Sequence, residues 1–321
     1  MLGLLNFQDR GGRVNAFGGE TRVVAAIAGG TGAVLSWVKG KLARYARLML
    51  GVELKREGSI AYREAEPQAP ESGDPVMLVH GFPQSSYMWA PVLAALAESG
   101  RRAIAPDLAG FGDSAPDPPG TWERQVSALE AFRRALGLER VALGLHDWGG
   151  MVGLRWACDH PGAVSALILS NTGFFADTQW HALARAFRTP GQGEQLLDNL
   201  TKEAFATMVR DQGGRIPEDA MDEYWKAFTS PARRRGMLEL DRSGDFEKLK
   251  PYEGQLAAMG VPALMLWGAN DPVVPVAAAY RFQREIPGSK VVVLEDASHF
   301  LYDDEPARCA REIVAFLAQR P

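Results

Sequence analysis

The sequence predicts an α/β fold in which a mainly parallel central sheet is flanked by helices. Short apolar runs, typical of buried strands, alternate with segments whose apolar residues follow helical spacing. A long helical stretch interrupts this alternation at residues 171–250. Because alternating strands and helices produce a parallel sheet covered on both faces, these observations define the fold class.

The predicted strands and helices can be placed in order along the chain. A hairpin is expected around the Glu57-Gly58 turn, from its turn residues and the two short runs beside it. The strands are expected at 52–55, 59–63, 75–79, 102–105, 140–145, 164–170, 261–267 and 291–294, and the helices at 87–99, 121–136, 151–160, 276–286 and 306–319.

The predicted domain organisation is a core with one inserted cap. Residues 51–170 and 251–321 form the core, and residues 171–250 form a helical cap over the carboxyl ends of the strands, where ligands bind in open α/β sheets. The run Arg233-Arg234-Arg235 is expected on a solvated face of a cap helix.

Residues 1–50 are predicted to be a helical extension whose role the sequence does not define. Positions 37–50 carry a basic amphipathic pattern. This pattern favours packing on the domain or on a second copy, giving a homo-oligomer; membrane-surface contact is the alternative. A signal peptide is not expected, because no charged segment precedes an apolar core and a cleavage site.

The composition is that of an ordinary globular protein. Of the 321 residues, 46% are hydrophobic and 23% are charged, and the net charge is −4. This charge argues against a nucleic-acid partner. Cys158 and Cys309 lie outside any metal-ligand spacing, so they are expected to be free thiols of a cytoplasmic protein. No metal or other cofactor is expected.

The segment at residues 145–150, Leu-His-Asp-Trp-Gly-Gly, joins a predicted strand to a predicted helix. A strand, a sharp turn and a helix expose the residue at the turn above the sheet, which is the geometry of a nucleophile elbow. The apex residue here is Asp147. A carboxylate at this position attacks carbon directly and forms an ester with the enzyme.

Further candidates follow other predicted strands in an order that suits a nucleophile, an acid and a histidine. Asp271 follows the first strand after the cap, and His299 follows the last strand. His299 would activate water to hydrolyse the ester, and Asp271 would orient its ring. The backbone N–H groups of Phe82 and Trp148 are candidates for the oxyanion hole.

Each of these residues also has a structural interpretation. An Asp in a strand-to-helix turn commonly caps the helix, and Trp148 could simply pack in the core. The position of Trp148 beside the nucleophile favours instead an indole N–H that binds a leaving halide. His80 and His146 are expected to support the site by hydrogen bonding.

From about residue 52 to 320, the chain resembles the α/β-hydrolase family, in the branch with an Asp nucleophile. The resemblance rests on residues 80–83 (His-Gly-Phe-Pro), 107–114 and 146–149, together with Asp271 and His299. This branch contains haloalkane dehalogenases, epoxide hydrolases and fluoroacetate dehalogenases. The resemblance implies the same fold, a covalent alkyl-enzyme ester and a small hydrophobic substrate.

Several positions favour haloalkane dehalogenases within this branch. Leu145 matches the bulky aliphatic residue that they commonly carry two residues before the nucleophile, and Trp148 matches their first halide-binding residue. Epoxide hydrolases use two lid tyrosines, but Leu183 stands where the first is expected and the segment 240–242 contains none. Fluoroacetate dehalogenases carry Arg at the position of Trp148.

Phe82 disagrees with this assignment, because haloalkane dehalogenases usually have Asn or Glu there and Asn often donates the second halide hydrogen bond. A Phe side chain cannot donate. The candidates for a replacement donor are Trp180, Trp225 and Asn171.

The sequence therefore predicts haloalkane hydrolysis to an alcohol and halide. The alternative is epoxide hydrolysis with Tyr224 as the proton donor. A non-catalytic binding module on the same fold is a third interpretation.

Overall fold

The computed structural model describes residues 51–319, which contain a single eight-stranded sheet. Its strand order is β1-β2-β4-β3-β5-β6-β7-β8; β1 pairs antiparallel with β2 and β2 with β4, and the remaining neighbours are parallel. The strands are β1 (Val52–Glu57), β2 (Ile60–Ala65), β3 (Val76–Val79), β4 (Ala103–Pro106), β5 (Val141–His146), β6 (Val164–Ser170), β7 (Ala263–Gly268) and β8 (Lys290–Leu294). The predicted fold class is confirmed.

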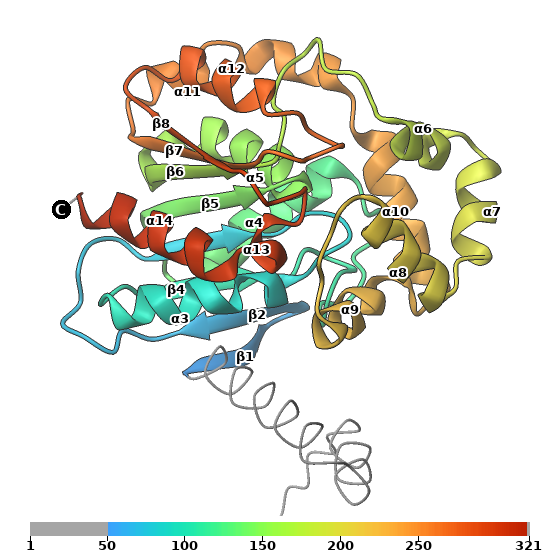
Figure 1. Cartoon of the computed structure of the whole chain (residues 1–321), viewed down its shortest axis with the longest axis horizontal. Helices are drawn as coiled ribbons and strands as arrows, with labels where there is room; N and C mark the ends of the chain where they lie inside the picture. The colour runs from blue at the N-terminus through green and yellow to red at the C-terminus, as the bar shows by residue number, and fades with distance from the viewer. Residues whose placement is uncertain (1–50, 320–321) are drawn as a thin grey trace, which may run out of the picture. The chain divides into compact units, whose positions relative to one another are not determined.

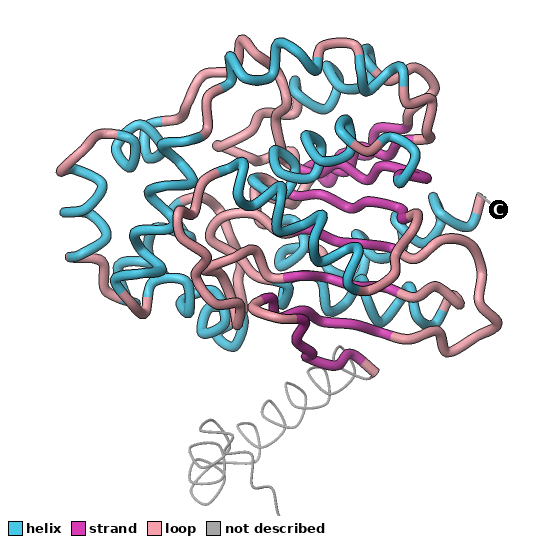
Figure 2. The backbone as a smooth tube through the Cα atoms, turned by 180° about the vertical axis from the view of Figure 1, so that it is seen from behind, coloured by secondary structure: helices cyan, strands magenta, loops and turns pink. Residues whose placement is uncertain are grey.

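Helices cover both faces of this sheet, which explains why its central strands are apolar throughout. All residues of β3, β4, β5 and β7 are buried, as expected for parallel strands packed on two sides. In Figures 1 and 2, helices lie in front of and behind the sheet. The core helices are η1 (Ser86–Trp89), α3 (Ala90–Glu98), α4 (Trp122–Ala135), α5 (Trp148–Asp159), η2 (Pro161–Ala163), α11 (Gln255–Ala258), α12 (Ala277–Glu285), α13 (Leu301–Asp304) and α14 (Pro306–Ala318).

Between β6 and β7 the described chain forms helices and no strand. Besides α11, these are α6 (Ala182–Arg188), α7 (Gln192–Asp198), α8 (Lys202–Asp211), α9 (Glu218–Trp225), η3 (Lys226–Phe228), α10 (Pro231–Ser243) and η4 (Phe246–Tyr252). Figure 1 shows α6 to α10 beside the carboxyl ends of the parallel strands. Side chains at these strand ends therefore face helices rather than open solvent.

Arg233, in α10, attaches this helical segment to the loop that follows β4. Its guanidinium donates hydrogen bonds to the carbonyl oxygens of Gly110, Gly112 and Ser114, at 2.7, 3.1 and 2.9 Å. Lys226 adds an ion pair to Asp113 of the same loop at 2.9 Å. The expectation that the arginine run lies on a solvated face is therefore wrong for Arg233, because its guanidinium supplies donors to loop carbonyls.

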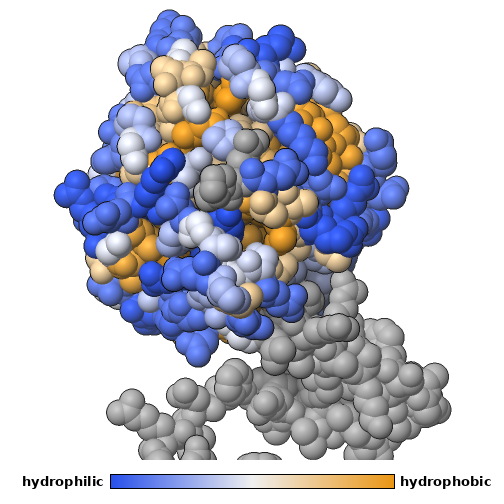
Figure 3. Space-filling view, turned by 90° about the vertical axis from the view of Figure 1, so that its left-hand side faces the viewer, coloured by the Kyte–Doolittle hydropathy of each residue, from blue (hydrophilic) through white to orange (hydrophobic). Residues whose placement is uncertain are grey.

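The surface turned away from the cap helices is mainly hydrophilic, with apolar residues in separate small groups (Figure 3). Among residues 51–319, no helix is long and apolar enough to cross a membrane. The predicted helical extension at residues 1–50 and its possible contacts lie outside the described residues.

Replacing Arg233 by Met should lower the free energy of unfolding by about 1–3 kcal/mol, because three loop carbonyls lose a charged donor. Arg235→Met is the matched control, since the Arg235 side chain is 81% exposed and pairs with Glu239 one turn further along α10. Its effect should stay within about 0.5 kcal/mol. Urea unfolding of both variants measures the difference, and equal losses would contradict the attachment by Arg233.

Candidate active site

Asp147 stands at a strained turn between the sheet and α5. β5 ends at His146, α5 begins at Trp148, and Asp147 between them adopts φ 49° and ψ −122°. Such a conformation is rare for a residue with a side chain and persists only where the surroundings enforce it. At Gly149 a Cβ atom would collide with the carbonyl oxygens of Val79 and His80, so the turn can approach β3 only with glycine there.

Three donors surround the Asp147 carboxylate. The Phe82 backbone N–H donates to Oδ1 at 2.7 Å, and the Trp148 backbone N–H also interacts with the carboxylate. His299 Nε2 lies 3.5 Å from Oδ2. Burial by itself would raise the pKa of Asp147, but the His299 hydrogen bond and charge outweigh it, so the pKa is lowered. Asp147 is therefore held in its charged form.

His299 lies between two carboxylates. Its Nδ1–H donates to Asp271 Oδ2 at 2.9 Å, while Nε2 faces Asp147. The other oxygen of Asp271 accepts from the backbone N–H groups of Val273 and Val274, at 2.7 and 2.9 Å. Burial opposes the imidazolium, but Asp271 and Asp147 together raise the pKa of His299 to about 10. The structure thus brings together the three residues that the sequence proposes as a triad.

The loop that carries Phe82 is fixed by His80. His80 Nδ1–H donates to the carbonyl of Gly81 at 2.9 Å, and Nε2 accepts from the Leu108 backbone N–H at 2.9 Å. This arrangement requires a neutral imidazole, and burial lowers the pKa of His80 accordingly. His80 therefore positions the Phe82 N–H and does not reach the cavity.

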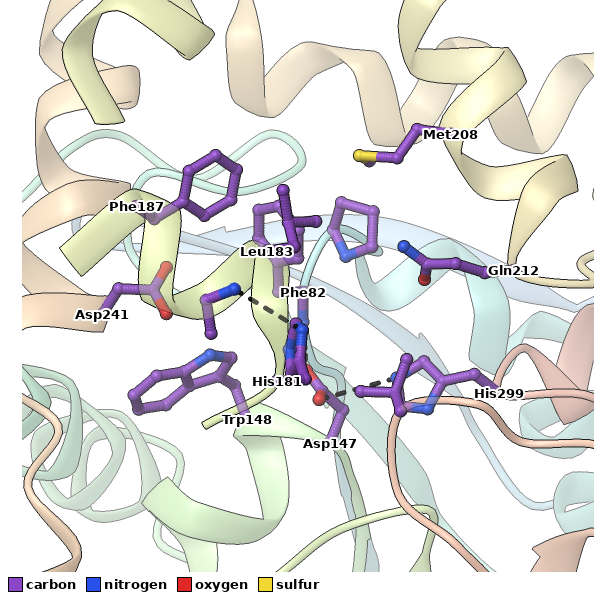
Figure 4. Close-up of a pocket in the computed structure, with 13 residues that line it drawn as sticks. Phe82, Asp147, Trp148, His181, Leu183, Phe187, Met208, Gln212, Asp241 and His299 are labelled. Carbon is purple, nitrogen blue, oxygen red and sulfur yellow. Dashed lines mark hydrogen bonds and ion pairs between the residues drawn. The ribbon is translucent and has the colours of Figure 1, made fainter. Parts of the chain in front are cut away.

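Asp147 and His299 open into a small cavity beneath α6 and α10 (Figure 4). It has a volume of about 30 Å³, which is room for about two water molecules. The cavity is lined by Phe82, Pro83, Asp147, Trp148, His181, Leu183, Ala184, Phe187, Met208, Gln212, Asp241, Val273 and His299.

A family model described as the alpha/beta hydrolase fold matches residues 74–306. The chain belongs to the α/β-hydrolase fold family. It is a hydrolase, as the resemblance of its sequence implies.

Several relatives of this hydrolase are named haloalkane dehalogenases. It is 30% identical to a haloalkane dehalogenase of Bradyrhizobium diazoefficiens over 300 residues, which cover 83% of this chain and 94% of the relative. It is 27% identical to a cis-3-alkyl-4-alkyloxetan-2-one decarboxylase of Xanthomonas campestris, covering 79% of this chain and 91% of the relative. The crystal structure of haloalkane dehalogenase DbeA from Bradyrhizobium elkani matches with a TM-score of 0.71 at 28% identity, over 84% of this chain and 97% of that one.

The Trp148 side chain of this hydrolase presents its N–H to the cavity. The indole is 5% exposed and lines the pocket, and no residue among 51–319 accepts a hydrogen bond from its Nε1. Its ring stacks on Trp180, with centroids 5.7 Å apart. Trp180 therefore supports Trp148 from behind and does not line the cavity, contrary to its predicted pocket role.

The other two aromatic residues predicted for the pocket also lie elsewhere. Tyr224 is fully buried and its hydroxyl donates to the Asp303 carboxylate at 2.9 Å. Trp225 stacks on Phe228, with centroids 5.4 Å apart. Tyr224 reaches the core through Asp303 and Trp225 packs inside the helical segment, so neither side chain lines the cavity with Asp147.

Asn171 lies behind the triad instead of in the pocket. Its amide donates to Asp271 Oδ2 at 2.6 Å and accepts from the Gly268 backbone N–H at 3.1 Å. Asn171 also adopts a positive φ of 44°, which aims its side chain at β7. It therefore positions Asp271, and its second amide hydrogen is donated to the Ser298 carbonyl at 3.1 Å.

Three polar residues of the cavity were missed by the sequence analysis: His181, Gln212 and Asp241. Asp241 is the most perturbed of them. It is 5% exposed, and burial followed by the nearby Asp147 charge raises its pKa to about 8, although Arg188 and Arg242 act in the opposite direction. At neutral pH Asp241 is therefore mostly a neutral carboxylic acid.

Replacing Asp147 by Asn should lower the pKa of His299 well below about 10, since one of the two carboxylates that stabilise the imidazolium loses its charge. Titration of the His299 ring nitrogens by NMR measures this shift. Asp198→Asn removes an exposed carboxylate of α7 and should leave the titration unchanged. An unaltered pKa in Asp147→Asn would refute the electrostatic coupling of the two residues.

Proposed function

We propose that this hydrolase cleaves haloalkanes through a covalent ester on Asp147. The observation that supports it best is that the two oxygens of the Asp147 carboxylate have different surroundings. Oδ1 accepts the Phe82 N–H, whereas Oδ2 faces the cavity side near His299. Oδ2 is then the attacking atom, and Oδ1 already lies where the oxyanion of the second step will form.

In the first step, Oδ2 forms a bond to a saturated carbon and the carbon–halogen bond breaks. The halide leaves with the electron pair and is stabilised by the Trp148 indole N–H, the only leaving-group donor that the resemblance supplies. The product is a neutral alkyl ester on Asp147. The negative charge of the site has moved from the carboxylate to the halide.

In the second step, water cleaves this ester. Ester formation removes the Asp147 charge that helps to keep His299 protonated, so its pKa falls and the imidazole becomes a base. His299 takes a proton from water, and the hydroxide attacks Cγ. The backbone N–H groups of Phe82 and Trp148 stabilise the oxyanion, and Asp271 stabilises the imidazolium. The bond from Cγ to the alkyl-bearing oxygen breaks, the alcohol leaves with the proton that His299 took from water, and the acid formed on Asp147 returns its proton to His299. The proton released overall is the one that His299 loses to solvent when the ester forms.

A second candidate is epoxide hydrolysis through the same ester. Asp241 supports it, because a neutral acid in the cavity can protonate an oxygen leaving group. Tyr224, the donor expected from the sequence, is bonded to Asp303 away from the cavity. The binding-module interpretation loses its support, since His299 faces Asp147 and relatives are enzymes.

The remaining expectations stay part of this proposal. Residues 51–170 and 251–321 are the core, residues 171–250 are the cap, and the substrate is small and hydrophobic. The cavity supports the last point, since most of its lining is apolar. A cytoplasmic location is supported by two buried free cysteines.

Asp147→Asn should lower turnover by about 10⁴-fold or more, because the nucleophile is lost. His299→Gln should instead accumulate the ester, which mass spectrometry locates on the Asp147 peptide. The substrates are 1-bromobutane, styrene oxide and a cis-3-alkyl-4-alkyloxetan-2-one. Halide release with an alkylated Asp147 supports the dehalogenase; labelling by the epoxide or the lactone alone reassigns the substrate class. Turnover by Asp147→Asn at the wild-type rate would refute the covalent mechanism.

A further inference from the structure

Asp241 is a buried acid that faces the reacting carboxylate from α10. Figure 4 shows its carboxyl group pointing toward the centre of the cavity, beside the Trp148 indole. Among residues 51–319, no group donates a hydrogen bond to its carboxyl oxygens; Arg188 donates to its backbone carbonyl instead. A buried carboxylate without donors is unstable, so this side chain is either neutral or awaits a ligand.

The two arginines near Asp241 do not neutralise it. Arg188 directs Nη1 to the backbone carbonyls of Asp241 and Gly244 and places its guanidinium over the Trp180 ring at 4.7 Å. Arg242 forms a two-point ion pair with Glu194, at 2.6 and 2.8 Å. Both cations are thus committed to other partners. A structural ion pair cannot account for the carboxyl group at position 241.

The proposed reaction needs a second hydrogen-bond donor for the leaving group, and Asp241 is placed to supply it. Trp148 offers a single N–H to the leaving group, and Phe82 has no side-chain donor. The aromatic residues expected to supply a second donor lie outside the cavity. Asp241 shares the cavity with Asp147 and Trp148 and, when protonated, carries an O–H.

We propose that Asp241 acts in its protonated form as the second leaving-group donor of this site, opposite the Asp147 nucleophile. This inference rests on the proposed function, since it requires Asp147 to displace a leaving group. A departing halide accepts a hydrogen bond from the Asp241 O–H and from the Trp148 N–H. A departing oxygen accepts the proton itself.

The charges balance in both cases. With a halide, Asp241 keeps its proton and the halide carries the negative charge out of the site. With an epoxide, the C–O bond breaks, the oxygen takes the Asp241 proton, and the charge passes from Asp147 to Asp241. Hydrolysis of the ester then releases one proton, which restores Asp241. No other reactant than water is needed.

Ionisation of Asp241 should switch this donor off. The charged or titratable groups that face it are Asp147 across the cavity, Arg188 of α6 and Arg242 of its own helix, with His181 and His299 on the cavity wall. Loss of the Asp241 proton removes the O–H and places a second negative charge beside the departing anion. Turnover should therefore fall as the pH rises through about 8.

The protonation state can be tested without a substrate. Because the pKa of Asp241 is higher in the folded protein than in the unfolded chain, its contribution to stability is complete below about pH 4 and is lost as the pH rises to about 8. Asp241→Asn is a neutral analogue and lacks this loss. Its melting temperature minus that of the wild type should increase from pH 4 to pH 8 and then level off. A difference that does not change with pH would overturn the neutral state. Asp198→Asn is the surface control.

The donor role is tested on whichever substrate alkylates the wild-type Asp147. Asp241→Asn keeps a hydrogen-bond donor but no acid, so bromoalkane turnover should persist and its fall above pH 8 should disappear. Epoxide opening should drop by about 10²–10⁴-fold. Asp241→Leu has neither group, and its bromoalkane turnover should fall by about 10²-fold, with chloroalkanes more affected than iodoalkanes because chloride needs more stabilisation.

These outcomes separate the two proposals. If no substrate alkylates Asp147, the proposed function fails, and with it the donor role, while the stability measurement still decides the protonation state. If Asp147 is alkylated but Asp241→Leu forms the ester at the wild-type rate, only the inference on Asp241 fails. A loss in Asp241→Leu that is equal for chloride, bromide and iodide would indicate a purely structural residue and would also overturn it.

Discussion

The negative charge of Asp147 in a largely buried position is the constraint on which the rest of the site depends. Its side chain is only 16% exposed, and burial alone would favour the neutral acid. The structure opposes this with the Phe82 N–H on one oxygen and His299 near the other. The strained backbone at the elbow follows from the same need, since only a sharp turn exposes Asp147 to both donors.

The charge of Asp147 changes the pKa values of His299 and Asp241. Together with Asp271, it raises the pKa of His299 by stabilising a cation, and it adds to the larger effect of burial in raising the pKa of Asp241. Asp147 therefore lies next to a cation, which Asp271 also stabilises, and a neutral acid. In the proposed mechanism, ester formation on Asp147 removes its charge, so His299 would become a base and Asp241 would ionise at lower cost. The covalent step would then prepare the hydrolytic step.

The sequence predicts the sheet and the triad because both follow from regular rules. Buried parallel strands are continuous apolar runs, and the carboxyl ends of parallel strands meet at one edge, so Asp147, Asp271 and His299 must lie near each other. No comparable rule predicts which side chains of the cap helices face the pocket. Tyr224 and Trp225 were expected in the pocket from their type, but aromatic side chains on short helices are large apolar groups, and here they pack inside the protein.

The position of Asp241 in the helical pattern indicates burial, although aspartate is usually a surface residue. On α10 the buried side chains include Met237, Leu238 and Leu240, and Asp241 stands one turn after Met237 on the same buried face. A carboxylate on the apolar face of an amphipathic helix needs a partner or a proton. The arginine run on the same helix gives the opposite error. A cluster of charges predicts a solvated face, but Arg233 donates hydrogen bonds to the carbonyls of a loop.

The leaving group of the reaction can be argued from basicity. A halide is a weak base and departs as an anion, so hydrogen bonds from Trp148 and Asp241 suffice and no proton is needed. An alkoxide is a strong base and therefore a poor leaving group. It can depart from carbon in this cavity only if an acid protonates it. Asp241 serves either leaving group only in its protonated form, since its carboxylate would repel a departing anion. In the proposed mechanism the same acid therefore donates a hydrogen bond to a halide and would protonate an oxygen leaving group.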